Sequence, residues 1–156
     1  MKLPLIEQAK IQAQVLVPLV RTLQAELGEE RANELVRQSL GDLYRGYGEA
    51  WWKAQGAKGF EAKVTAAFQD FAAGGALDYE VVRQTEEAVE LKVTGCRYAK
   101  FYQALGAPEL GFLLTCSADF PFAEGFGGDV EFTRTQTIMQ GADHCDFRYR
   151  LKGGKK

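Results

Sequence analysis

The sequence predicts an α+β domain, in which helices pack on a small antiparallel sheet of about four strands. Apolar residues recur at helical spacing through residues 1–75, and the spacing then changes to the period of two that is typical of strands. Residues 97–116 return to helical spacing between two pairs of such strands. A run of helices followed by strands with one helical insert favours this class over an alternating α/β fold.

The length and charge of the chain narrow the classes of protein further. With 156 residues, the chain is long enough to bury a hydrophobic core without the help of disulfides or bound metals. We expect a single domain over 1–156, with a helical part at 1–75 and a site-bearing sheet at 76–152. The formal net charge of −2 argues against a nucleic-acid partner. No apolar stretch has the length of a membrane span, and the start does not resemble an export signal, so we expect a cytoplasmic protein.

Three helices are predicted in the first part. The first runs from Pro4 to Leu27 and contains Pro18, which predicts a kink or a break between two helices. Its apolar residues lie nearly all round, which predicts burial on several sides and favours a homodimer. The second helix follows directly, with either close packing or a break at Gly46–Gly48, and the third runs from Phe60 to Gly74.

Four strands are predicted in the second part. Residues 77–93 alternate with a turn near residues 84–87, which indicates a hairpin with one buried face. Residues 130–138 and 144–151 predict a second hairpin around Gly141. In its last strand the apolar side chains that follow Cys145 share one face, and the charged side chains share the other.

All three cysteines and the single histidine lie in the last third of the chain, as Cys96, Cys116, Cys145 and His144. By residue type they could form a tetrahedral site for zinc or iron, although no Cys-x-x-Cys pair is present. In a reducing compartment the odd number of cysteines favours thiols or ligands over disulfides. The structural alternative is that the cysteines are buried core residues, which fits Cys145 well.

A nucleophilic cysteine is the third interpretation, because a thiolate needs a nearby base or positive charge. Cys96 lies just before a predicted helix, and Arg97 adds a positive charge beside it. His144 points away from its neighbour on the strand but could serve Cys96 or Cys116 across space.

Four carboxylates lie near these cysteines, at Asp119, Glu124, Asp143 and Asp146, and could do general acid–base work. Asp143, beside the turn at Gly141, best fits a structural role. Each has a structural alternative as a turn or cap residue. Asp146 carries more weight than the others, because aspartate is depleted in strands.

Polar side chains between the last two cysteines could bind a small ligand. Thr133 and Thr135 share one face of the predicted strand with Thr137, and an exposed polar strand face would look the same. Arg134 and Arg148 could bind a substrate carboxylate, although arginines are common on surfaces.

Two long stretches resemble the L-2-amino-thiazoline-4-carboxylic acid hydrolase family. Residues 96–111, CRYAKFYQALGAPELG, resemble its central motif, and residues 133–149, TRTQTIMQGADHCDFRY, resemble its C-terminal one. Between them Cys116, Asp119 and residues 122–126 also fit, while the N-terminal half matches loosely. The sequence departs from the family pattern after FAEGF, where Gly127 and Gly128 replace a frequent Asn-Pro.

The resemblance implies an enzyme with a small-molecule substrate, which opens the ring of L-2-amino-thiazoline-4-carboxylate to give N-carbamoyl-L-cysteine, a step towards cysteine. Water or a protein nucleophile adds at C2 of the ring, and the tetrahedral intermediate expels the ring thiolate. On this hypothesis Cys96 or Cys116 is a nucleophile or a ligand. His144 and Asp146 transfer protons, and Arg134 or Arg97 holds the carboxylate.

Two other classes are consistent with the same residues. A non-catalytic, sensor-like domain would bind a small molecule or a metal without turnover. A purely structural domain would keep its three cysteines buried and unreactive.

Overall fold

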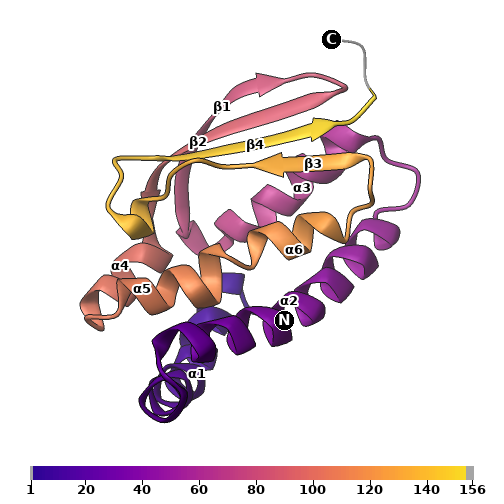
Figure 1. Cartoon of the computed structure of the whole chain (residues 1–156). Coiled ribbons are helices and arrows are strands. Elements are labelled where there is room, and N and C mark those ends of the chain that lie inside the picture. Colours follow the sequence, from indigo (N-terminus) through magenta and orange to yellow (C-terminus); the bar gives the residue numbers. More distant parts are fainter. Residues whose placement is uncertain (1, 154–156) are drawn as a thin grey trace.

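The structure, a computed structural model, describes residues 2–153 and confirms the α+β class. Helices cover one face of a four-stranded antiparallel sheet of order β1-β2-β4-β3 (Figure 1). In chain order the elements are α1 (Leu5–Leu27), α2 (Glu29–Ala54), α3 (Phe60–Ala72), η1 (Ala73–Gly75), β1 (Leu77–Gln84), β2 (Ala88–Cys96), α4 (Arg97–Ala104), α5 (Pro108–Gly111), the π-helical turn η2 (Phe112–Cys116), α6 (Asp119–Glu124), β3 (Val130–Thr133), η3 (Ile138–Gln140) and β4 (Cys145–Leu151).

The first helix is continuous, so the alternative of a break at Pro18 is wrong. Proline removes one backbone donor, but the helix is held along its length by contacts with α2, α3 and α4. Burial on several sides is also wrong, because the helix buries a single face. Ile11, Val15 and Leu19 form an exposed apolar stripe, with 55, 67 and 51 % of their surfaces accessible.

The second helix is also continuous, and its glycine serves close packing rather than a break. A Cβ at Gly48 would overlap the backbone carbonyl oxygen of Phe122 in α6. Gly125, which follows α6, approaches the backbone of α2 in the same way, at Arg45 and Glu49. The two helices therefore touch through their main chains. Within residues 2–153, no helix combines the length and the apolar character needed to cross a bilayer.

The sheet has one buried and one exposed face, as the alternation predicted. Val89, Leu91 and Val93 of β2 are buried, and β4 adds Cys145 and Phe147 on the same face. β2 and β4 pair in the centre, which places residues distant in sequence side by side.

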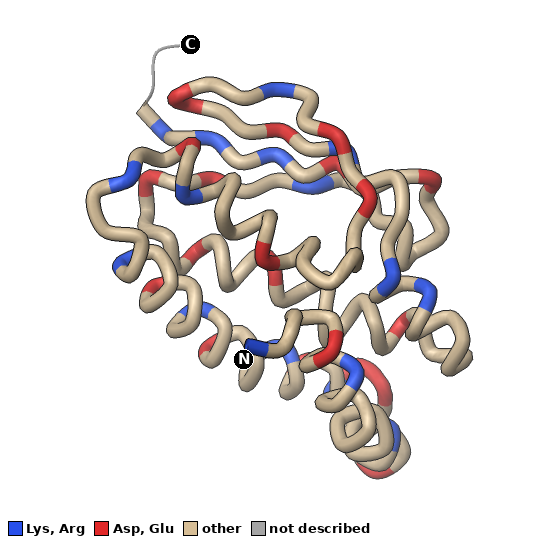
Figure 2. Tube along the Cα trace, turned by 180° about the vertical axis from the view of Figure 1, so that it is seen from behind, with Lys and Arg blue, Asp and Glu red and all other residues tan. Residues whose placement is uncertain are grey.

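The outer face of the sheet carries charges of both signs. Glu90 pairs with Arg83 and Arg148, and Arg150 pairs with Glu131. Figure 2 shows acidic and basic residues interspersed along these strands. Exposed pairs of this kind contribute little to stability.

The second pair of strands differs from the predicted hairpin. β3 ends at Thr133, and a connection containing η3 leads to β4, so Thr135 and Thr137 do not lie on a strand. The reason is a long-range cap. The Asp146 carboxylate accepts hydrogen bonds from the backbone N–H groups of Thr135 and Gln136, at 2.8 and 3.0 Å, in place of strand partners.

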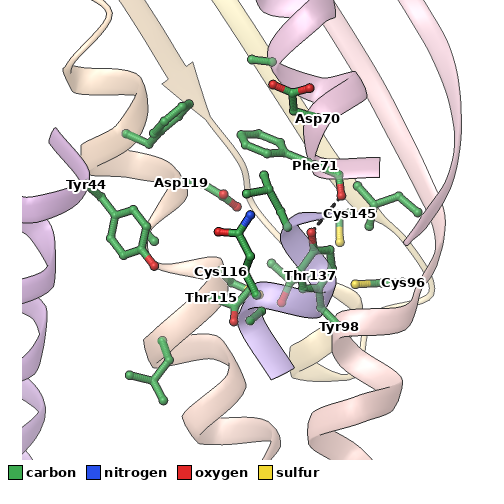
Figure 3. Close-up of a pocket in the computed structure, with 18 of the residues that line it drawn as sticks. Tyr44, Asp70, Phe71, Cys96, Tyr98, Thr115, Cys116, Asp119, Thr137 and Cys145 are labelled. Atoms are coloured by element: carbon green, nitrogen blue, oxygen red, sulfur yellow. Dashed lines mark hydrogen bonds between the residues drawn. The ribbon is translucent and has the colours of Figure 1, made fainter. Parts of the chain in front are cut away.

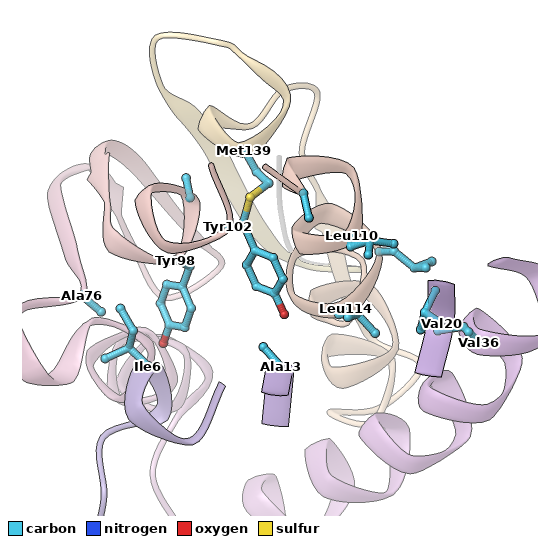
Figure 4. Close-up of a cluster of buried hydrophobic side chains, with 13 residues drawn as sticks. Ile6, Ala13, Val20, Val36, Ala76, Tyr98, Tyr102, Leu110, Leu114 and Met139 are labelled. Atoms are coloured by element: carbon cyan, nitrogen blue, oxygen red, sulfur yellow. The ribbon is translucent and has the colours of Figure 1, made fainter. Parts of the chain in front are cut away.

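Two hydrophobic clusters form the core. One lies between α1, α2, α4, α5 and η2, where Tyr102 and Leu110 are almost fully buried (Figure 4). The other lies between α3, α6 and the inner face of the sheet, around Phe68. The turn η2 belongs to the first cluster and leads directly into α6. It closes with a bond from the Ser117 N–H to the Phe112 carbonyl at 2.8 Å, five residues back.

Candidate active site

A cavity of about 320 Å³ lies between the helices and the inner face of the sheet. Side chains from α1, α2, α3, α4, α6, η2 and the sheet line it (Figure 3). Lys2, Gln12 and Tyr47 are exposed lining residues and mark its opening. Pockets of this size and depth are typical sites for small ligands.

The fold brings all three cysteines to this cavity. Cys96 ends β2, Cys116 ends η2, and Cys145 begins β4, where it pairs with Val93 of β2. All three carry free thiols. The pairing of β2 with β4 brings Cys96 and Cys145 to the cavity, and η2 adds Cys116.

A buried ion pair lies beside the thiols. Arg134 Nη1 donates to Asp119 Oδ2 at 2.6 Å, and Arg134 Nη2 donates to the Cys116 carbonyl at 3.0 Å. Only 2 % of the arginine side chain is accessible, whereas 20 % of the aspartate side chain remains accessible beside the cavity. The guanidinium carbon lies 5.2, 5.6 and 5.1 Å from the ring centroids of Phe120, Phe132 and Phe147.

The environment shifts the acidity of Asp119. Burial raises the pKa of this carboxyl above its ordinary value, and the charge of Arg134 and its hydrogen bond offset only part of the effect. A carboxylate with a raised pKa accepts a proton more readily than an exposed aspartate, which suits a general base.

The surroundings of the cysteines keep their side chains protonated. Burial raises the pKa of Cys116 well above its usual range, with a further contribution from Asp119 that Arg134 partly offsets. Burial also raises the pKa of Cys145, to about 11. All three sulfurs are thus thiols at neutral pH, which does not favour the predicted thiolate nucleophile.

The position of Cys96 before a helix does not lower the pKa of its thiol as predicted. Cys96 does cap α4, as expected, and its Sγ accepts the Ala99 N–H at 3.4 Å. Burial nevertheless raises the pKa of Cys96 more than the hydrogen bonds from Ala99 and Tyr98 lower it. The neighbouring Arg97 pairs with Asp78 at 2.6 Å instead of lining the cavity.

Hydroxyl groups complete the polar lining, and sequence reasoning missed most of them. The Tyr98 hydroxyl donates to the Phe71 carbonyl at 2.9 Å, and Thr137 donates to Gln140 Oε1 at 3.0 Å. Figure 3 shows the Tyr44 hydroxyl turned towards the cavity, and in the described part of the chain it has no hydrogen-bond partner. Burial, Tyr47 and the charge of Asp119 raise the pKa of Tyr44, so it remains a donor at neutral pH.

His144 and Asp146 do not line the cavity. His144 lies in the connection before β4, where its Nδ1 is 2.6 Å from Asp143 Oδ1. Burial alone would raise the pKa of Asp146, but hydrogen bonds from the Thr135 side chain and from the Thr135 and Gln136 backbones lower it. These residues hold the connection in place, and the expectation that they transfer protons at the site is not supported by their positions.

Three other predicted site residues also lie outside the cavity. Glu124 is exposed at the end of α6 and pairs with Arg45 at 3.1 Å. Thr133 is exposed at the end of β3, and Thr135 donates its hydroxyl to Asp146. Glu124 follows Asp119 by five residues and Phe122 by two, and at about 100° per residue it therefore points to the opposite side of α6 from both.

The predicted metal set is not assembled. Across residues 2–153, no three side chains among histidine, cysteine, aspartate and glutamate are arranged to hold an ion. His144 would have to join Cys96, Cys116 and Cys145, but it lies in the connection outside the cavity. These four residues therefore do not form the tetrahedral site that their types suggested.

Comparison with known proteins agrees with the resemblance carried by the sequence. A sequence model described as L-2-amino-thiazoline-4-carboxylic acid hydrolase matches residues 8–149, which include Asp119, Arg134 and all three cysteines. No curated protein matches the sequence. Because the matched region covers nearly the whole chain, the protein belongs to the L-2-amino-thiazoline-4-carboxylic acid hydrolase family, whose reaction is hydrolysis of the thiazoline ring.

Proposed function

We propose that the protein hydrolyses L-2-amino-thiazoline-4-carboxylate in this cavity, with Asp119 as the group that accepts a proton from water. The observation that carries the proposal is the buried Asp119–Arg134 pair beside the cavity, in which Oδ2 and Nη1 are 2.6 Å apart. A mechanism based on this pair does not need a cysteine thiolate. The family membership supplies the reaction, and the pair supplies a base suited to it.

The chemistry requires one water and returns every proton. Asp119 takes a proton from water as the oxygen forms a bond to C2 of the ring. The resulting tetrahedral centre collapses, the C2–S bond breaks, and the electron pair leaves on sulfur. Asp119 then returns the proton to the sulfur, and the proton of the added hydroxyl moves to the ring nitrogen as the C2–O bond becomes a carbonyl, which gives N-carbamoyl-L-cysteine. The Tyr44 hydroxyl, which donates to no other described residue, stabilises the substrate by a hydrogen bond.

Arg134 acts through Asp119. Its Nη1 and Nη2 already donate to the carboxylate and to the Cys116 carbonyl, which favours a positioning role over the predicted binding of the substrate carboxylate. Its charge also counteracts burial and so keeps Asp119 ionised over a wider range of pH.

The test compares two isosteric replacements on α6. Asp119→Asn should lower kcat by about 10²–10⁴-fold, because the amide cannot accept the proton. Glu124→Gln makes the same change at an exposed position outside the cavity and should stay within about twofold of wild type. Product thiol is measured with a thiol reagent. A folded Asp119→Asn variant with more than half the wild-type kcat would exclude Asp119 as the base.

A second variant tests the hydroxyl. Tyr44→Phe should lower kcat about tenfold while leaving the thermal midpoint nearly unchanged, since the hydroxyl has no hydrogen-bond partner among residues 2–153. Saturable binding of the thiazoline by wild type without any release of thiol would instead support the sensor-like alternative.

We also propose a homodimer formed through α1. The exposed stripe of Ile11, Val15 and Leu19 is spaced evenly about Val15. A two-fold axis at Val15 therefore places Ile11 of one copy against Leu19 of the other and makes the stripe its own complement. Sedimentation should show a dimer that Val15→Asp converts to a monomer. A wild-type protein that is monomeric over a wide concentration range would refute it.

We extend the proposal to a cytoplasmic location and a role in cysteine metabolism. Three free thiols are the state that a reducing cytosol maintains, which supports a cytoplasmic location. N-carbamoyl-L-cysteine needs only loss of its carbamoyl group to give cysteine, which supports a role in cysteine metabolism. Thiazoline-dependent growth on a limiting sulfur source, and its loss with Asp119→Asn, would test this role.

A further inference from the structure

We infer that the preferred substrate is a 2-amino-thiazoline carboxylate whose ring carries an apolar substituent of about four carbon atoms. The inference rests on the proposed function, because it uses the same cavity and the same ring-opening step. It concerns the part of the cavity that the unsubstituted substrate leaves unfilled.

The size of the cavity is the first observation. An engineered cavity of about 150 Å³ holds benzene, which has six non-hydrogen atoms. In the same proportion, the nine non-hydrogen atoms of L-2-amino-thiazoline-4-carboxylate need about 220 Å³. The cavity measures about 320 Å³, which leaves room for roughly four more atoms.

The nature of the lining is the second observation. The charged pair of Asp119 and Arg134 is confined to one part of the cavity. Most of the remaining wall is aromatic and aliphatic, and Phe71 and Phe122 lie with their ring centroids 5.7 Å apart. Asp70 also lines the cavity, where its carboxylate accepts a hydrogen bond from Trp51 Nε1 at 3.2 Å. An unsubstituted polar substrate offers nothing that benefits from this wall, whereas an alkyl group would be transferred from water to it.

The arrangement on α6 connects the two parts. Asp119 and Phe122 are three residues apart and line the cavity from the same face of the helix. Trp51 of α2 continues the apolar wall, with its ring centroid 6.4 Å from that of Phe122. A ring whose C2 lies at Asp119 therefore extends a substituent towards Phe122, Phe71 and Trp51.

The reaction balances as it does for the parent substrate. Water adds at C2, the C2–S bond breaks, and the product is an N-carbamoyl cysteine that keeps the substituent on its own carbon. No oxidant or further reactant is needed.

The experiment compares wild-type kcat/KM for L-2-amino-thiazoline-4-carboxylate with that for its 5-butyl analogue, followed by thiol release. We expect the butyl compound to be favoured at least tenfold, which is the discrimination that even a single methylene gives in an apolar pocket. If the parent compound is hydrolysed and the analogue is no better, this inference is wrong and the proposed function stands. If neither compound is hydrolysed, the proposed function fails, and the inference fails with it.

A matched pair of variants locates the preference. Phe71→Ala should reduce the butyl-to-parent ratio at least fivefold. Phe101→Ala removes another half-buried phenylalanine that does not line the cavity, and it should leave the ratio unchanged. Because a ratio measured on one sample does not depend on the fraction of folded enzyme, partial unfolding of either variant does not obscure the result. An unchanged ratio in Phe71→Ala would overturn the assignment of the aromatic wall.

Discussion

Replacing Arg134 with methionine removes the charge from the buried ion pair while keeping most of the side-chain stem. The remaining Asp119 carboxylate, one-fifth accessible, then loses its cationic partner. Removing one partner of a buried pair destabilises a protein by about 3–5 kcal/mol, because the other charge stays buried. Because the Asp119 carboxylate is partly accessible from the cavity, we expect the loss of stability to lie at the lower end of this range, at about 3 kcal/mol.

This loss is measurable as a change in thermal midpoint. For a chain of this length each kcal/mol lowers Tm by about 2–4 °C, so Arg134→Met should lower it by about 6–12 °C. Arg45→Met is the matched control, because Arg45 also pairs with a carboxylate of α6 but at the exposed Glu124. Exposed pairs contribute at most about 1 kcal/mol.

The two variants are compared by differential scanning fluorimetry or calorimetry at neutral pH. Adding Asp119→Asn to Arg134→Met should recover part of the lost stability, because the unpaired carboxylate is gone. Equal losses in Arg134→Met and Arg45→Met would refute the argument, since they would show that the buried pair contributes no more than an exposed one.

Three further predictions follow from other features. The pKa of Asp119 is raised, and in the proposed mechanism its ionised form is the base, so kcat/KM should fall as pH decreases through a midpoint above the ordinary aspartate value; a flat acid limb would contradict this role. Gly48→Ala should destabilise by about 1–3 kcal/mol through overlap with the Phe122 carbonyl, whereas Gly46→Ala, with nothing nearby, should stabilise by up to about 1 kcal/mol, both measured by urea unfolding. Native Cys145, with a pKa of about 11, should react slowly with a thiol reagent at neutral pH and quickly after unfolding; rapid native labelling would show that it is accessible.

Periodicity was enough to predict the helices and the first hairpin, because each depends on residues close in sequence. It could not predict the end of β3. That end depends on Asp146, a residue more than ten positions away, which supplies the hydrogen bonds that a strand partner would have made. The same residue looked like a catalytic candidate because aspartate is rare in strands, and the cap is the physical reason for its presence.

The candidate site was predictable in part. Residue type singled out the three cysteines, Asp119 and Arg134, and the pairing of β2 with β4 and the path of α6 bring them to one cavity. Residue type also singled out His144, which chain geometry leaves in a connection outside. Tyr44 was missed, although its spacing from Leu40 and Tyr47 places it on the apolar face of α2, because a helical pattern does not reveal what that face covers.

The π-helical turn η2 determines the directions in which the side chains of α6 point around the helix axis. Residues 108–124 form one nearly continuous helical path, and each residue added to or removed from such a path rotates the later part by about 100°. The wide turn lets Leu110 and Leu114 face the first core cluster while Asp119 and Phe122 face the cavity. A single deletion inside Phe112–Cys116 would restore α-helical winding without altering any cavity residue before or after it. It would nevertheless turn Asp119 away from the cavity, so in this protein the number of residues in one turn determines the lining of the cavity as much as their identity does.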